Sequence, residues 1–276
     1  MISSGGSYHD LYIYLIDGVV PAEDEAAFED GFIGRWIEGE SSFLFFSKPS
    51  REKVDVLLRT RPDISFLQEH HFSYDEWQGS FSGPIQVENF LIVPPWKDVE
   101  AENGLIKILL DPGVVFGTGL HPTTRDCLKA LLGLMSRECV EKILDLGTGR
   151  GILALAAARL GAKQVLAVDL NPLCVKTTRR NVSLNHLEET IEVLEGGAED
   201  LAGSPVDLVV ANIHYDVLAG LVDQPEFQGT GWYILSGLLR SQARDIETRL
   251  KLRGLKVADM WDHEATWYTM LVRASA

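Results

Sequence analysis

Short, continuously apolar segments alternate with helical segments over residues 142–235, and this alternation constrains the fold more than any other feature of the sequence. The apolar runs cover residues 142–146, 165–169, 191–194, 207–211 and 232–235. Strands that are covered on both faces lack the polar–apolar alternation of half-exposed strands. The pattern therefore predicts an α/β fold with a mostly parallel, Rossmann-like sheet between helices. Residues 255–275 carry no helix signal and are expected to finish the sheet with an antiparallel strand pair.

A glycine-rich loop follows the first of these strands. Residues 145–151 read DLGTGRG and open a helix predicted over 152–160. Glycines let the backbone turn sharply and let a ligand approach without a Cβ in the way. The register differs from the G-x-G-x-x-G of dinucleotide-binding proteins, and Asp145 would repel a pyrophosphate. The methionine part of S-adenosylmethionine, with its cationic amino group, fits Asp145, Gly147 and Gly149 better.

A second acid ends the next strand. Asp169 lies twenty positions after Gly149, where a carboxylate can accept hydrogen bonds from both hydroxyls of a ribose. Asn171 and Pro172 then predict the N-cap and first position of a helix. The loop and its two acids together predict a nucleoside-cofactor site rather than a glycine turn of an unrelated α/β protein.

The N-terminal part of the chain predicts a separate, smaller unit. Residues 1–75 are expected to form a small α+β domain of the ferredoxin-like type, in the order strand, helix, strand, helix, strand. The strands are predicted at 11–16, 42–46 and 64–67, and the helices after Pro21 and over 51–58. A second domain is expected over 76–276, with residues 76–95 as a connector. The first elements expected in this second domain are strands at 90–93 and 106–110 and a helix that begins at Pro122.

The charge balance bears on partners. Twenty-five basic and forty acidic residues leave a net charge of −15, which disfavours direct binding to nucleic acid and suits a basic protein substrate. Solubility alone is the competing explanation. Neither a membrane-spanning run nor a secretory signal is visible, so a cytoplasmic protein without membrane contact is expected. The oligomeric state stays open.

The three cysteines form no C-x-x-C pair. Cys127, Cys139 and Cys174 are an odd number, and the sequence predicts buried, reduced thiols and no metal site.

Four stretches resemble one family. Residues 116–124 (FGTGLHPTT), 145–153, 209–213 (VVANI) and 235–238 (LSGL) are similar to PrmA, the methyltransferase family of large-subunit ribosomal protein eleven, in order and spacing over residues 88–275. The resemblance implies a class I methyltransferase fold and S-adenosylmethionine as cofactor. It also implies N-methylation of protein amino groups, with ribosomal protein eleven as the first candidate substrate. In the family the N-terminal domain captures the substrate, and residues 1–75 share only its coarse pattern.

The resemblance also implies which residues bind the cofactor. The family's cofactor residues fall on Thr124, Gly147, Asp169 and Asn212. Ala198, with Glu199 beside it, follows the third strand and is expected to border the adenine. An acidic loop without a ligand is an equally good interpretation of these two positions.

An amine acceptor must lose its proton before it attacks a methyl group, since free lysine has a pKa of about 10.4. A desolvated pocket with oxygen acceptors would lower that pKa and aim the lone pair. Asn212 is the best-placed acceptor, and His214 is the second candidate catalytic residue, with Tyr215 next to it. A helix-start histidine and a packing tyrosine are the structural alternatives.

The sequence departs from related motifs at two places. Residues 212–215 (NIHY) lack the paired prolines used by adenine and glutamine methyltransferases, and Thr148 and Arg150 stand where PrmA members commonly have cysteine and serine. Three alternatives therefore stay open. They are a methyltransferase of another protein or a small molecule, an NAD-dependent oxidoreductase, and a cofactor-binding module without activity.

Overall fold

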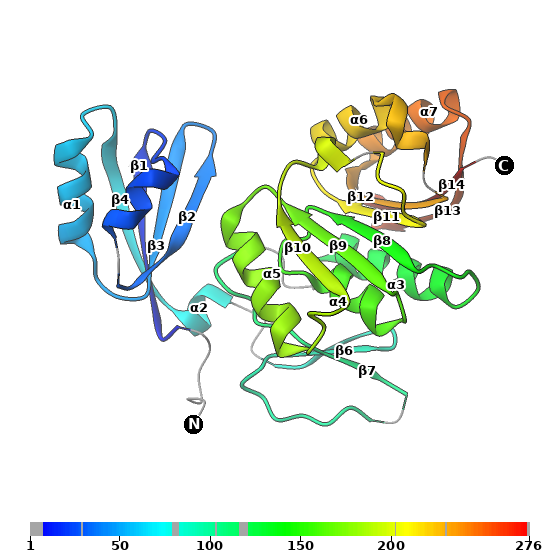
Figure 1. The fold of residues 1–276 in the computed structure, drawn as a ribbon, viewed down its shortest axis with the longest axis horizontal. Coiled ribbons are helices and arrows are strands. Elements are labelled where there is room, and N and C mark those ends of the chain that lie inside the picture. The colour runs from blue at the N-terminus through cyan, green and yellow to red at the C-terminus, as the bar shows by residue number, and fades with distance from the viewer. Residues whose placement is uncertain are drawn as a thin grey trace.

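The structure is a computed structural model and describes residues 8–28, 30–78, 83–102, 104–115, 121–201, 203–229 and 231–274. Figure 1 shows a smaller N-terminal unit beside a larger unit that is built on a twisted sheet. The division of the chain between residues 75 and 76 stays a prediction.

The larger unit is organised by a seven-stranded sheet in the order β10-β9-β8-β11-β12-β14-β13. β14 pairs antiparallel with β12 and with β13, and the other neighbours are parallel. This confirms the Rossmann-like sheet with an antiparallel C-terminal pair. The strands are β8 (Lys142–Leu146), β9 (Gln164–Asp169), β10 (Ile191–Glu195), β11 (Leu208–Asn212), β12 (Trp232–Leu239), β13 (Leu255–His263) and β14 (Trp267–Ala274).

Helices cover both faces of this sheet. One apolar cluster joins it to α3 (Pro122–Met135), α4 (Ile152–Arg159) and α5 (Pro172–Leu184). A second joins its other face to α6 (Tyr215–Asp223) and α7 (Arg240–Leu252). The two layers explain why the strands are continuously apolar: both of their faces are buried.

The predicted helix starts are confirmed. Pro122 occupies the first turn of α3, and the Asn171 side chain accepts a hydrogen bond from the backbone N–H of Leu173 at the start of α5. α4 ends at Arg159, and Gly161 follows with a φ of +106°, a left-handed conformation that favours glycine.

A three-stranded sheet lies against α3 and α4. It consists of β5 (Ile85–Val87), β6 (Phe90–Val93) and β7 (Ile106–Leu109), and its apolar side chains join the same cluster as α3 and α4. The predicted strands at 90–93 and 106–110 are therefore confirmed, and β5 was not predicted.

The N-terminal unit is a four-stranded antiparallel sheet in the order β2-β3-β1-β4. Its elements are β1 (Asp10–Asp17), the 3-10 helix η1 (Ala22–Ala27), β2 (Phe32–Glu38), β3 (Ser41–Phe46), α1 (Arg51–Thr60) and β4 (Ser65–Ser73). This order of strands and helices is ferredoxin-like, as expected.

The sequence predicted three strands in this unit, one fewer than the structure contains. β2 was missed because Gly34 and a shift of register between Phe32 and Gly34 interrupt its alternation. β4 runs six residues beyond the predicted 64–67, since an edge strand tolerates polar residues such as Glu69 and His70. The predicted connector begins as a short helix, α2 (Tyr74–Gln78).

Two of the three cysteines are buried as predicted, Cys127 and Cys174, whereas Cys139 is exposed, so its predicted burial was wrong. Cys139 lies in the loop between α3 and β8, outside both helical layers. Within the described ranges, no helix combines the length and apolar character needed to span a bilayer.

A buried asparagine on α5 holds the loop that precedes α3. The Asn181 Oδ1 accepts a hydrogen bond of 2.7 Å from the Asp111 N–H, and its Nδ2 donates to the carbonyls of Asp111 and Arg150 at 2.9 Å. Asn181 is fully buried. It therefore ties α5 to this loop and to the glycine loop at once.

Removal of the Asn181 amide should destabilise the protein. Asn181→Ala leaves three buried backbone groups without partners, so we expect the free energy of unfolding to fall by about 3 kcal/mol. Urea denaturation followed by circular dichroism measures this loss. Ser183→Ala, on an exposed position of the same helix, is the control and should stay within about 0.5 kcal/mol of the wild type. Equal midpoints for the two variants would contradict the role given to Asn181.

Candidate active site at the carboxyl edge of the sheet

The predicted site residues come together where the parallel strands end. Gly147 follows β8, Asp169 ends β9 and Asn212 ends β11. In the sheet, β8 lies between β9, the next strand in the sequence, and β11, which comes after β10 in the sequence. The strand order therefore reverses at β8. Ligands of α/β proteins bind at the carboxyl edge beside such a reversal of strand order.

The glycine turn needs its glycines. Gly147, Gly149 and Gly151 have φ values of +67°, +59° and +82°, a region that residues with a Cβ rarely adopt. A Cβ on Gly147 would also collide with the side chain of Ile213. The side chain of Ile213, just after β11, therefore packs directly against the backbone of the turn at Gly147.

Asp169 faces this turn. Its Oδ2 accepts a hydrogen bond of 2.9 Å from the Gly149 N–H, and its Oδ1 accepts one of 2.9 Å from the Asn171 N–H. The residue is only partly buried. The carboxylate predicted to bind a ribose therefore lies beside the glycine turn and keeps access to solvent.

Asp145 lies beneath the turn. Its side chain is 1% exposed, and its Oδ2 accepts a hydrogen bond of 2.6 Å from the Thr148 hydroxyl. Burial raises the pKa of Asp145 to about 6, although the bond from Thr148 lowers it. Among the described residues, no lysine, arginine or histidine forms an ion pair with it. The site thus contains a buried acid whose negative charge lacks a counter-ion in contact.

Thr124 and Asn212 meet across the edge of the sheet. Thr124 lies in the first turn of α3 and is 7% exposed, and the Asn212 Nδ2 donates to its hydroxyl over 3.4 Å, a long hydrogen bond. On β12, Gly237 leaves no space for a Cβ beside the Asn212 Oδ1 and the Ile213 carbonyl. The structure therefore joins two residues that lie far apart in the sequence. The motif residues 116–120 lie outside the described residues.

His214 and Tyr215 have different surroundings. His214 is exposed at the N-cap of α6, close in sequence to Asn212, and its catalytic role stays a prediction. The Tyr215 hydroxyl donates to the Asp245 carboxylate on α7 over 2.8 Å. Tyr215 is thus held by the helix layer, which agrees with the packing alternative.

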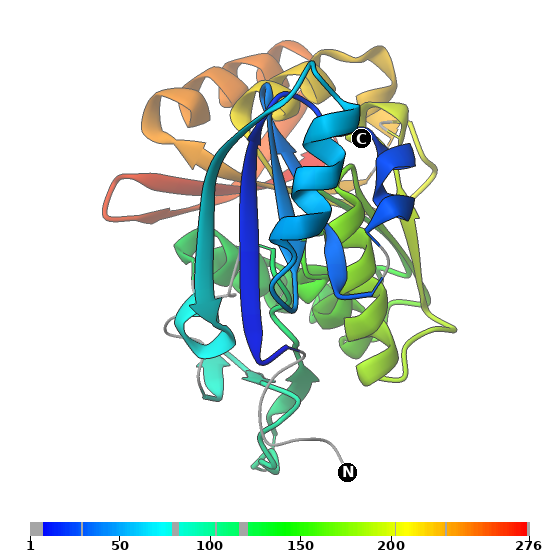
Figure 2. The ribbon, with the colours of Figure 1, turned by 90° about the vertical axis from the view of Figure 1, so that its left-hand side faces the viewer.

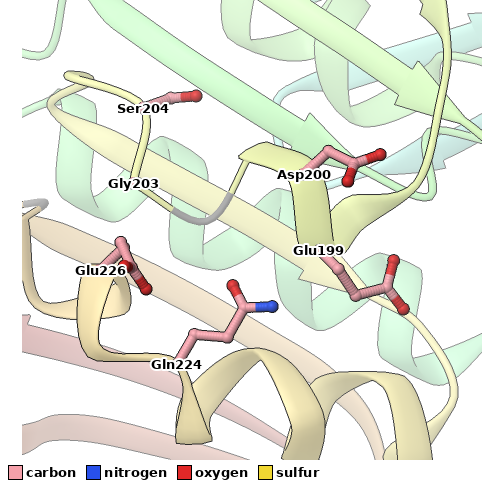
Figure 3. Close-up of a pocket in the computed structure, with 6 residues that line it drawn as sticks. All are labelled: Glu199, Asp200, Gly203, Ser204, Gln224 and Glu226. Carbon is pink, nitrogen blue, oxygen red and sulfur yellow. The ribbon is translucent and has the colours of Figure 1, made fainter.

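Ala198 opens the short helix η2 (Ala198–Leu201) just after β10 and is partly buried. Glu199, next to it, lines a pocket of about 620 Å³ together with Asp200, Ser204, Gln224 and Glu226. Figure 3 shows these side chains between η2 and the turn that follows α6. None of the residues predicted to bind a cofactor lines this pocket, which is an acidic hollow, and the role of Ala198 and Glu199 at the adenine stays a prediction.

Two side chains near the site were not predicted. The Trp267 ring, at the start of β14, meets the His121 ring at 4.9 Å between centroids and an angle of 75°. Arg150 is 6% exposed, and its Nε donates to the Val115 carbonyl at 3.1 Å. The sequence could have pointed to Arg150, because an arginine stands inside the glycine loop. The contact of Trp267 with the start of α3 could not be read from the sequence, because it depends on the strand order. Across the described residues, no group of three or more His, Cys, Asp or Glu side chains is arranged to hold a metal ion.

Comparison with known proteins agrees with this geometry. The sequence matches the family model described as ribosomal protein L11 methyltransferase (PrmA) over residues 51–275. A protein of that name from Desulforamulus reducens is 39% identical over 221 residues, which are 76% of this chain and 71% of that protein. One from Clostridium perfringens is 32% identical over 231 residues, which are 81% of this chain and 72% of that protein.

A solved structure resembles the fold as well. The ribosomal protein L11 methylase from Lactobacillus delbrueckii subsp. bulgaricus has a TM-score of 0.61 and 29% identity, covering 70% of this chain and 100% of that one. The family model covers most of the chain, including every predicted site residue. The chain therefore belongs to the ribosomal protein L11 methyltransferase (PrmA) family, a family of protein methyltransferases.

Proposed function

We propose that this protein transfers the methyl group of S-adenosylmethionine to amino groups of ribosomal protein L11. The observation that carries the proposal is the pair of acids at the glycine turn. Asp169 faces the turn, and Asp145 lies buried beneath it without a counter-ion in contact. A dinucleotide brings a pyrophosphate to such a turn, and the buried Asp145 beneath it would repel that group. The NAD-dependent alternative is therefore disfavoured.

The residues present fit the cofactor. A buried carboxylate with a raised pKa favours a ligand that brings a positive charge, and S-adenosylmethionine carries an ammonium group and a sulfonium. Asp169 would bind the ribose, and Gly147 and Gly149 would contact the methionine part. Thr124 and Asn212 would line the side of the site nearest α3. Ala198 would border the adenine. The bound cofactor supplies an activated methyl group, so the protein chiefly aligns the acceptor.

Asn212 and His214 are the proposed catalytic residues. The Asn212 Oδ1 would accept a hydrogen bond from the substrate amine and aim its lone pair, because the Nδ2 of the same amide is held by the Thr124 hydroxyl. His214 is exposed beside it and would accept the proton that the amine loses.

The net charge of −15 favours a basic protein substrate. Ribosomal protein L11 is the first candidate, because the relatives carry its name, and an enzyme that acts on a ribosomal protein would lie in the cytoplasm. Another basic protein or a small molecule remains the competing acceptor.

The substrate assignment predicts a labelling result. Incubation with tritiated S-adenosylmethionine should incorporate label into purified L11, and His214→Gln should slow this reaction without abolishing it, by about tenfold or more. Scintillation counting of gel bands measures both. Label in another lysate fraction and none in L11 would redirect the substrate, while a His214→Gln rate equal to that of the wild type would remove His214 from the mechanism.

The ribose contact predicts a loss of affinity. Asp169→Ala removes a charged hydrogen-bond acceptor, so we expect the Kd for S-adenosylhomocysteine to rise by at least about tenfold. Isothermal titration calorimetry measures it. Asp216→Ala, an exposed acid in the first turn of α6, is the control and should change Kd by less than about threefold. Equal affinities for both variants would place the ribose elsewhere.

The raised pKa of Asp145 predicts a pH dependence of binding. The ionised carboxylate favours the ammonium group that S-adenosylhomocysteine shares with S-adenosylmethionine, so affinity for S-adenosylhomocysteine should rise as the pH rises through about 6 and level off above that value. In Asp145→Asn the slope between pH 5 and about 7 should disappear. Calorimetric titrations over that range test this. A wild-type profile that is flat from pH 5 to about 7 would mean that the charge of Asp145 does not act on the ligand.

A further inference from the structure

The N-terminal sheet packs on the two segments that flank the cofactor site. Figures 1 and 2 show this sheet beside α5, and the contacts confirm that they touch. A single buried cluster joins the two units. It contains Leu11, Ile13, Ile33, Phe45 and Tyr74 from the N-terminal side and Val114, Val115, Leu173 and Cys174 from the catalytic side, each 6% exposed or less. Such a core holds the units together by burial of apolar surface.

The first segment is the start of α5. The Lys176 Nζ donates to the Ile33 carbonyl of β2 at 2.9 Å, so a helix of the catalytic unit is bonded directly to the N-terminal sheet. Gly34 lies against Leu173, and a Cβ on Gly34 would collide with the Leu173 side chain. The backbone of β2 therefore rests on the first turn of α5.

That first turn also holds Asp169. The Leu173 N–H donates to the Asn171 side chain, and the Asn171 N–H donates to the Asp169 Oδ1, each at 2.9 Å. In addition, the neighbouring Asp169 carboxylate adds to the effect of burial in raising the pKa of the Cys174 thiol. Two hydrogen bonds thus separate the surface under β2 from the carboxylate proposed to bind the ribose.

The second segment is the part of the chain just after β7, residues 110–115. The Arg150 guanidinium donates to the Val115 carbonyl through both Nε and Nη2, and Val115 lies in the cluster between the units. Arg150 follows Gly149, whose N–H donates to the other oxygen of Asp169. The cluster therefore reaches Asp169 from both sides, through α5 and through the glycine turn.

We propose that Lys176 and Arg150 are positioning residues that couple docking of the N-terminal sheet to binding of the cofactor. The docked sheet fixes the first turn of α5 and the glycine turn, and both fix the Asp169 carboxylate. Coupling between two binding events is reciprocal, so the bound cofactor tightens the docking of the sheet. A protein substrate that binds this sheet and alters its docking would change cofactor affinity. The inference rests on the proposed cofactor site.

The first test measures the affinity for S-adenosylhomocysteine in variants with substitutions at the contact between the two units, which leave the proposed cofactor-binding residues unchanged. Gly34→Ala and Lys176→Met should each weaken the binding of S-adenosylhomocysteine at least about fivefold by calorimetry, and Lys176→Arg should restore most of the loss. Gly39→Ala, in the turn between β2 and β3, is the matched control, because Gly39 also has a positive φ (+60°) but its added Cβ meets no atom within 4 Å. Lys163→Met, at an exposed position, is the control for the lysine.

The second test measures the reciprocal effect, which a purely structural role would not produce. Hydrogen exchange of the β2 amides, residues 32–38, should slow when S-adenosylhomocysteine binds the wild type and respond much less in Lys176→Met. Lys176 is exposed, so this variant keeps the test valid even if Gly34→Ala fails to fold.

The outcomes separate the two proposals. Wild-type protein that does not bind S-adenosylhomocysteine would overturn the proposed function and this inference with it. Wild-type protein that binds, together with unchanged affinity in Lys176→Met and unchanged exchange in β2, would overturn the coupling alone.

Discussion

The hydrogen bonds between the Asp169 carboxylate and the two loops beside it are the interaction on which the rest of the site depends. Asp169 accepts from Gly149 on one side and from Asn171 on the other, so the ends of β8 and β9 are joined through one side chain. The positive φ angles of the glycine turn make this contact possible, because they aim the Gly149 N–H at the carboxylate. The carboxylate and the turn thus form one hydrogen-bonded surface.

Charge gives this surface its chemical preference. Asp145 is buried under the turn, and burial opposes its ionisation. A cation above the turn relieves that cost, whereas an anion increases it. The same loop geometry that holds a pyrophosphate in other α/β proteins therefore selects a cationic ligand here. The selection comes from the acid beneath the turn, since the glycines themselves serve both kinds of ligand.

The predictions succeeded where local pattern and burial agree. Burial on both faces makes the parallel strands continuously apolar, so β8, β9, β10 and β11 were predicted to within one residue at each end, whereas β12 runs four residues beyond the predicted 232–235. Gly147, Asp169 and Asn212 follow from the ends of β8, β9 and β11. The pattern failed at β2, where Gly34 and a bulge break the alternation, and at β4, a polar edge strand. It also gave no sign that Trp267 meets His121 or that Arg150 bonds to Val115.

The sequence by itself determined the sheet, the glycine turn, its two acids and the family, because each is encoded in residues close together along the chain. Only the tertiary structure decided which distant residues meet: Thr124 with Asn212, and Lys176 with the backbone at Ile33. Such contacts depend on strand order and on how the two units pack. These are set by the combined burial of many side chains, which no single local pattern records.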